Sequence, residues 1–164
     1  VHTVFHMFNE AYAPIFGFAS LPDSRVDEYT EKFLKYLDLT LMPVVVDEKG
    51  EIVGACITMP SLSLAVQKTG GRMLPFGWWH LVKAMKFKHE DTLTLLLIGV
   101  RPEYQGYGVS AVIFDYLIPV LNKKGFKWAE TGPQLEYKSK ELSQWKPLNP
   151  EVAKRRRCYQ KALK

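Results

Sequence analysis

The sequence has little cysteine, no long apolar run and no internal repeat. Its two cysteines, Cys56 and Cys158, are far apart and form no Cys-x-x-Cys pair. Neither a disulfide framework nor a zinc site is therefore expected. The longest apolar run is far shorter than the ~20 residues that a membrane-spanning helix needs. These absences argue against disulfide-rich, zinc-binding, transmembrane and repeat proteins, and they predict reduced thiols in a cytoplasmic protein.

What the sequence does contain favours one packed domain over residues 1–164. Hydrophobic residues make up 47% of the chain and aromatic residues 13%, which is enough for a proper core and argues against disorder. The formal charge of +5 suits an anionic ligand but is also common without one. No signal peptide is visible, and the chain starts at Val1. We therefore expect a part of a longer protein, or a processed start.

The most informative stretch runs from Thr92 to Leu121. An apolar run over 93–100, stopped by Arg101-Pro102, predicts a strand that is buried on both faces. A glycine-containing turn follows over 105–110. After it, apolar residues recur at helical spacing, which predicts a helix that ends near Gly125. The unit is thus a strand, a glycine loop and a helix.

Such a junction has the chemistry of an anion site. The first N–H groups of a helix lack partners within the helix, and the helix dipole places positive charge there. Together they can bind a phosphate, and Gly106 and Gly108 allow close approach of a ligand. No Gly-Lys-Ser/Thr follows, so the loop is not a Walker loop. It also lacks the third glycine of the dinucleotide-binding pattern.

The loop resembles the acetyl-CoA loop of the GNAT superfamily of N-acetyltransferases, whose signature is Arg/Gln-x-x-Gly-x-Gly/Ala. Here the signature reads Gln-Gly-Tyr-Gly-Val-Ser over 105–110, with Ser110 in place of the final Gly/Ala. The preceding Val100-Arg101-Pro102-Glu103-Tyr104 is a common lead-in in that superfamily. The alternative is an ordinary strand-turn-helix whose glycines serve only the turn.

The order of the expected elements fits the same resemblance. Helices are expected over 2–15 and from Pro22-Asp23-Ser24 onward, and a hairpin of two strands over 41–47 and 52–59. A short strand at 127–130, a helix at 137–146 and a final strand at 154–163 follow the glycine loop. The resemblance implies an α+β (α/β) fold with a mixed, mostly antiparallel central sheet flanked by helices. The usual first strand is missing, which suggests the C-terminal half of a longer bacterial protein with two GNAT-like domains.

Residues 60–91 depart from a minimal GNAT domain. Short helices are expected over 61–69 and 78–88, and the second is aromatic and basic, with Trp78, Trp79 and His80 at its start. The resemblance places this helical insertion over the acceptor side of the domain. It could be a lid over a bulky or apolar acceptor, or a membrane-surface helix. The tryptophans could equally pack on the sheet.

The resemblance implies transfer of an acetyl group from acetyl-CoA, without a metal, to a primary amine of a small molecule or peptide. Main-chain groups of Ile98 and Val100 are expected on the pantetheine and acetyl side. The residues expected to line the pyrophosphate are Gln105, Gly106, Tyr107, Gly108, Val109 and Ser110. Candidate bases are Glu130 and Asp91. Trp145 stands where the family has a proton-donating Tyr, and Tyr159 or Tyr137 could substitute for it.

Two other interpretations remain open from the sequence. A degenerate GNAT fold could bind CoA or an acyl ligand in a structural or regulatory role, and Trp145 favours this. A nucleic-acid binder using Arg155 to Arg157 is the weakest, because the basic residues are scattered and no such motif is present. We therefore expect acetyl-CoA, an unknown amine and an N-terminal domain of the same longer chain as partners, with no nucleic acid. A homodimer is left open.

Overall fold

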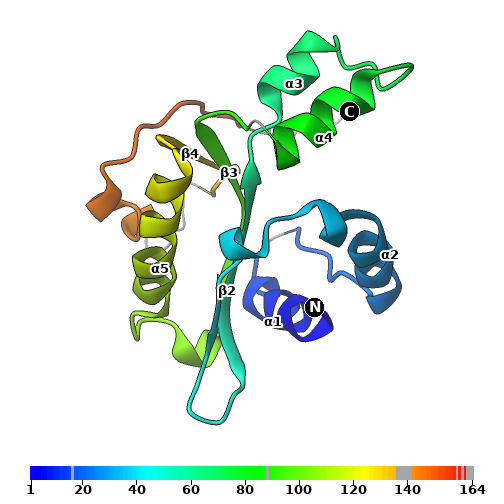
Figure 1. The fold of residues 1–164 in the computed structure, drawn as a ribbon. Coiled ribbons are helices and arrows are strands. Elements are labelled where there is room, and N and C mark those ends of the chain that lie inside the picture. Colours follow the sequence, from blue (N-terminus) through cyan, green and yellow to red (C-terminus); the bar gives the residue numbers. More distant parts are fainter. Residues whose placement is uncertain (16, 88, 136–141, 158, 160, 162–164) are drawn as a thin grey trace. The chain divides into compact units, whose positions relative to one another are not determined.

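The computed structural model describes residues 1–15, 17–87, 89–135, 142–157, 159 and 161. They fall into two compact units, Val1–Gly132 and Pro133–Lys164. The first unit contains the sheet and the expected cofactor loop (Figure 1). Among the described residues, no helix has the length and apolar character required to cross a membrane.

The first unit is built on a four-stranded sheet with the order β1-β2-β3-β4. β1 pairs antiparallel with β2, β2 antiparallel with β3, and β3 parallel with β4. Seven of the nine β2 residues are buried and most are hydrophobic, as expected for a central strand. The strands are β1 (Val44–Val46), β2 (Ile52–Pro60), β3 (Thr92–Val100) and β4 (Trp128–Thr131).

Helix α1 (His2–Tyr12) covers one face of the sheet. Its Met7 and Phe8 are fully buried and form a core cluster with Ala55 and Ile57 of β2. Gly99 of β3 makes room for this packing, because a Cβ there would come within 2.8 Å of the Phe8 ring. α2 (Asp23–Phe33) follows α1 and begins directly after Pro22. Asn9 joins the two helices through two hydrogen bonds to the main chain of Leu21.

Helix α5 (Val109–Lys124) covers the opposite face of the sheet (Figure 1). Ile113 and Leu117, which are almost completely buried, anchor it. The first turn lies close to β2, because a Cβ on Gly54 would be only 2.6 Å from Cγ1 of Val109. The helix ends at Gly125, whose φ of 84° is the left-handed geometry of a glycine C-cap. The start of α5, and with it the preceding loop, is thereby held against the sheet.

The predicted α+β fold, a mixed and mostly antiparallel sheet flanked by helices, is confirmed. Helices α3 (Ser63–Lys68) and α4 (Gly77–Lys86) lie between β2 and β3, where the sequence predicted an insertion. The final strand expected over 154–163 is wrong for the described residues, since 151–157, 159 and 161 adopt no regular structure. Half of the helix expected over 137–146, residues 137–141, lies outside the described residues. Residues 142 and 143 are helical, and a 3-10 turn, Lys146–Leu148, begins at the end of the expected range.

Candidate functional site

The site begins where two neighbouring strands separate. β4 pairs with β3 only from Thr92 to Leu95 of β3, whereas the pairing of β3 with β2 continues to Val100. The register of the β2–β3 pair shifts at Leu96, which has no partner in β2 and is a β-bulge. Beyond Leu95, no strand among the described residues pairs with this edge of β3. An open strand edge of this kind can bind the amide groups of an extended ligand.

The glycine loop follows the open end of β3. A 3-10 turn, Pro102–Tyr104, leads into Gln105, and α5 begins at Val109. Gly106 and Gly108 have φ values of 89° and 83°, in the left-handed region that favours glycine. A Cβ at either position would meet no atom of the described residues within 4 Å. The space next to the loop backbone is therefore open to a ligand. The two positions favour glycine because of their positive φ values, and not because a neighbouring protein atom would collide with a Cβ.

The loop contains main-chain N–H groups that have no acceptor among the described residues. Within the described part of the chain, no acceptor is bonded to the N–H groups of Gly106, Gly108, Val109 and Ser110. Tyr107 N–H makes a long hydrogen bond of 3.4 Å to the Tyr104 carbonyl. These N–H groups lie at the positive end of a 16-residue helix with no side-chain cap. Amides in this arrangement bind phosphate-like anions.

The loop is tied to the sheet by two side chains. Gln105 Nε2 donates to the Val100 carbonyl at 3.2 Å, and Tyr104 Oη donates to Asp47 Oδ2 at 2.8 Å. Asp47 Oδ1 also accepts the N–H of Glu51 and of Lys49 in the β1–β2 turn. These bonds, first from Glu51 N–H and then from Tyr104, lower the pKa of Asp47. The stabilisation from these bonds is therefore fully present above the ordinary pKa of an Asp side chain. It is lost as the pH falls through the lowered pKa of Asp47.

A residue not expected from the sequence occupies the open edge of β3. The hydroxyl of Tyr12, at the end of α1, donates to the Ile98 carbonyl at 2.7 Å. It also accepts the Ile98 N–H at 3.1 Å. Both main-chain groups of Ile98 thus have a protein partner, and the Val100 carbonyl has Gln105. A cofactor that used Ile98 through its main chain would have to replace bonds to Tyr12.

Tyr12→Phe is expected to reduce the free energy of unfolding by about 1–3 kcal/mol, because it leaves a partly buried N–H and carbonyl without partners. The ring would keep its stacking on Phe8, where the centroids are 5.8 Å apart. Urea denaturation would measure the change. The exposed Tyr116 offers a control, and Tyr116→Phe should be neutral within experimental error. Equal stability of the Tyr12→Phe variant and the original chain would show that these bonds contribute nothing.

The structure places the predicted catalytic residues as follows. Glu130 lies in β4 opposite Thr94, one residue before β3 and β4 separate, and its side chain is exposed. Asp91 precedes β3, and its carbonyl accepts the N–H groups of Lys127 and Trp128. Tyr159 belongs to the other unit and is 88% exposed. Tyr137 lies outside the described residues.

Trp145, in the second unit, is buried, and its indole N–H donates to Oε1 of Gln134 at 2.9 Å. Its one polar hydrogen is thus used in a structural bond. An indole N–H is in any case far too weak an acid to protonate a thiolate. Trp145 therefore cannot take the role of the Tyr expected at its position.

Cys56 is a structural thiol in the middle of β2. It is buried, and burial raises its pKa to about 12. The nucleophilic thiolate is therefore almost absent at neutral pH. In a Cys158→Ser variant, we expect Cys56 to resist a thiol reagent at pH 8 until the protein is unfolded. Labelling of the native protein at the unfolded rate would contradict this placement.

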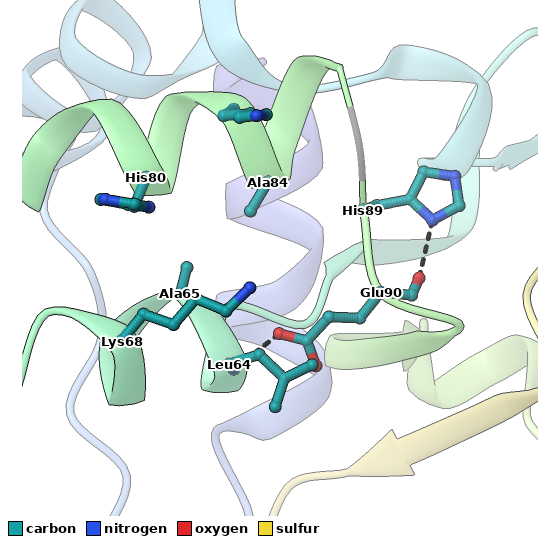
Figure 2. Close-up of a pocket in the computed structure, with 8 residues that line it drawn as sticks. Leu64, Ala65, Lys68, His80, Ala84, His89 and Glu90 are labelled. Carbon is teal, nitrogen blue, oxygen red and sulfur yellow. Dashed lines mark hydrogen bonds between the residues drawn. The ribbon is translucent and has the colours of Figure 1, made fainter.

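A cavity of about 330 Å³ lies away from the loop, between α3 and α4 (Figure 2). Polar side chains from both helices and from the segment before β3 line it: Lys68, His80, Lys83, His89 and Glu90. Figure 2 shows the Glu90 carboxylate at the α3 end, where Oε1 accepts the N–H of Leu64 at 2.6 Å. This cavity is at the start of β3 and the glycine loop is at its end, roughly 25–30 Å along the strand. It contains none of the predicted site residues.

The arrangement of strands, splay and loop is the fold of the GNAT acetyltransferases. An aminoglycoside acetyltransferase from an uncultured soil metagenomic sample, solved with sisomicin, has a TM-score of 0.56 at 15% identity, covering 99% of this chain and 88% of that one. A GNAT family acetyltransferase from Brucella melitensis, solved in complex with acetyl-CoA, has a TM-score of 0.51 at 17% identity, covering 85% and 73%. At these identities the likeness shows the fold alone.

Two curated proteins are similar in sequence. The bacterial ceramide synthase of Caulobacter vibrioides is 25% identical over 105 residues, which cover 64% of this chain and 27% of that protein. Protein YghO of Escherichia coli K12 is 25% identical over 161 residues, covering 96% and 41%. The chain thus spans less than half the length of either relative. No model of a protein family matches it.

Proposed function

We propose that the chain is the CoA-binding domain of an N-acyltransferase that transfers acetyl from acetyl-CoA to a primary amine. The observation that carries this proposal is the set of N–H groups of Gly106, Gly108, Val109 and Ser110, which have no acceptor among the described residues. They lie at the start of α5, directly after a strand whose edge is opened by the splay of β4. The pyrophosphate of CoA would bind these amides. The pantetheine arm would lie along β3 near Ile98 and Val100, where it would replace the bonds between Tyr12 and Ile98. The Brucella neighbour was solved with acetyl-CoA, which supports this choice.

The proposed reaction needs few groups from the protein. The amine nitrogen attacks the thioester carbon, the new C–N bond forms, and the C–S bond breaks. The amine proton would leave through Glu130, directly or by way of water. The CoA thiolate would take a proton from Tyr159 or from water, since a thiol with a pKa of ~8.5 is a good leaving group without much help.

The amine acceptor and the length of the acyl group are the two features of the reaction that experiments must determine. A small-molecule amine is supported by the aminoglycoside acetyltransferase neighbour. The Caulobacter relative is a ceramide synthase by name, so a long acyl chain and a lipid amine belong among the substrates to be tested. Because the chain spans 27% and 41% of its two relatives, an N-terminal domain of the same polypeptide would complete the acceptor site.

A second candidate is a degenerate domain that binds CoA or an acyl ligand without catalysis. The observation that favours it is Trp145, whose indole N–H is bonded to Gln134 where the family places a Tyr. A structural or regulatory role in a longer protein would then explain the intact loop without a proton donor.

Two measurements separate these functions. Calorimetric titration with acetyl-CoA, and with a series of longer acyl-CoAs, tests binding. Release of free CoA thiol in the presence of an amine panel, from aminoglycosides to a long-chain amino alcohol, tests turnover. Binding with amine-dependent thiol release supports the acyltransferase. Binding of acetyl-CoA without thiol release supports the degenerate domain. Salt-sensitive binding to DNA, without any effect of CoA, would contradict both proposals and indicate a nucleic-acid binder.

A further inference from the structure

We propose that the insertion between β2 and β3 docks on an anionic lipid bilayer. This inference is independent of the proposed function and concerns a different part of the chain. The insertion consists of α3, α4 and the connecting loop. Figure 1 shows these elements beyond the end of the sheet at which β2 ends and β3 begins. The cofactor loop lies at the other end of β3.

The insertion exposes several large apolar side chains that are close together in the sequence. Its loop and the start of α4 carry a cluster that we call the apolar tip, formed by Met73, Leu74, Phe76, Trp78 and Trp79. Leu74 and Phe76 are 81% and 73% exposed, and the two tryptophans are about half exposed. The tryptophan rings pack edge to face on each other, 5.9 Å apart. About half of each tryptophan side chain is therefore open to solvent.

The chain segment that carries the apolar tip has charged side chains of one sign. No Asp or Glu occurs from Ile52 to His89, whereas five basic residues do: Lys68, Arg72, Lys83, Lys86 and Lys88. Lys68 and Arg72 are exposed and come directly before the tip in the chain. Aromatic and aliphatic side chains next to Lys and Arg are the composition of segments that lie in a membrane interface. Trp in particular prefers the headgroup level.

The same charge argues against the other occupants of this surface. A second copy of the chain would bring an equally basic, acid-free insertion into a self-complementary contact, and the like charges would repel. The apolar tip includes the loop that connects α3 and α4, and it is not a groove. A projecting loop of this kind is suited to insert into the headgroup region of a bilayer. Anionic headgroups would neutralise the cations while the tip enters the acyl boundary.

The test uses the full 164-residue chain and vesicles without any acyl-CoA. Co-sedimentation would compare phosphatidylcholine vesicles that contain phosphatidylglycerol with pure phosphatidylcholine vesicles. We expect saturable binding to the anionic vesicles, weaker binding to the neutral ones, and weakening by salt. The triple variant Phe76→Ser/Trp78→Ser/Trp79→Ser should lose at least tenfold in vesicle affinity. Lys68→Glu/Arg72→Glu should reduce binding to the anionic vesicles selectively.

A matched control changes exposed aromatic residues outside the insertion. Trp128 and Tyr116 are exposed, and Trp128→Ser/Tyr116→Ser should bind vesicles like the original chain. If the triple variant does not fold, the original chain can be tested with vesicles that contain brominated lipids. We expect these lipids to quench its tryptophan fluorescence. No binding to anionic vesicles would overturn the proposal, as would equal losses in the triple and control variants. Self-association that depends on the apolar tip, without vesicle binding, would identify a second copy as the occupant and would also overturn it.

Discussion

Replacing Gly106 or Gly108 by alanine is expected to weaken binding of acetyl-CoA about tenfold or more. A Cβ at these positions meets no protein atom within 4 Å. The effect would therefore come from the backbone and the ligand, since both glycines have positive φ and both lie where the diphosphate would approach. A hydrogen bond to a charged group contributes about 1.5–3 kcal/mol, and about 1.4 kcal/mol is a factor of ten in affinity. Calorimetry would measure the change.

Gly50→Ala provides the matched control. Gly50, in the β1–β2 turn, has a φ of 80°, and a Cβ added there would likewise meet no protein atom within 4 Å. Its replacement should cost the same conformational strain, about 1–2 kcal/mol of stability, and leave acetyl-CoA affinity unchanged. If Gly50→Ala weakens the affinity as much as the loop variants do, the loss reflects general destabilisation. If Gly106→Ala and Gly108→Ala bind normally, the loop is not the cofactor site.

Ile113→Ala is expected to reduce the free energy of unfolding by about 2–5 kcal/mol, the usual range for truncating a fully buried Ile. Ile113 is 0% exposed, and its Cδ1 would be 3.5 Å from a Cβ on Gly54 of β2. It therefore anchors the first half of α5 on the sheet, and with it the loop. Urea denaturation should show a lower midpoint at an unchanged m-value.

The control for Ile113 is its neighbour on the same helix. Val112 is 56% exposed, so Val112→Ala should change stability by only about 0.5 kcal/mol. Both substitutions lower β-branching in a helix and gain similar helix propensity. A comparable loss in the two variants would show that α5 is not held to the sheet through Ile113.

Much of the fold could be predicted because its signals are local. The apolar run over 93–100, the glycines at 106 and 108 and the helical spacing after Val109 specify the strand, loop and helix without reference to the rest of the chain. The β1–β2 hairpin and the insertion helices follow from similarly local patterns. The GNAT fold then follows from the order of these elements together with the resemblance of the loop.

The remaining features depend on contacts between distant segments. Tyr12 bonds to Ile98 across 86 residues, and nothing in the spacing of α1 signals this. The bulge at Leu96 arises from the pairing of β3 with β2, which a continuous apolar run does not reveal. The final strand was expected from the family's order of elements, yet residues 151–157 contain a run of exposed basic side chains and little to bury. A sequence of that composition gains little from sheet formation.

The most direct test of the central claim is an amide NMR titration of the chain with coenzyme A. If the N–H groups at the start of α5 bind the diphosphate, the signals of Gly106, Gly108, Val109 and Ser110 should shift strongly and saturate together, while that of Gly50 stays in place. Saturable binding of coenzyme A with these four signals unmoved would contradict the account.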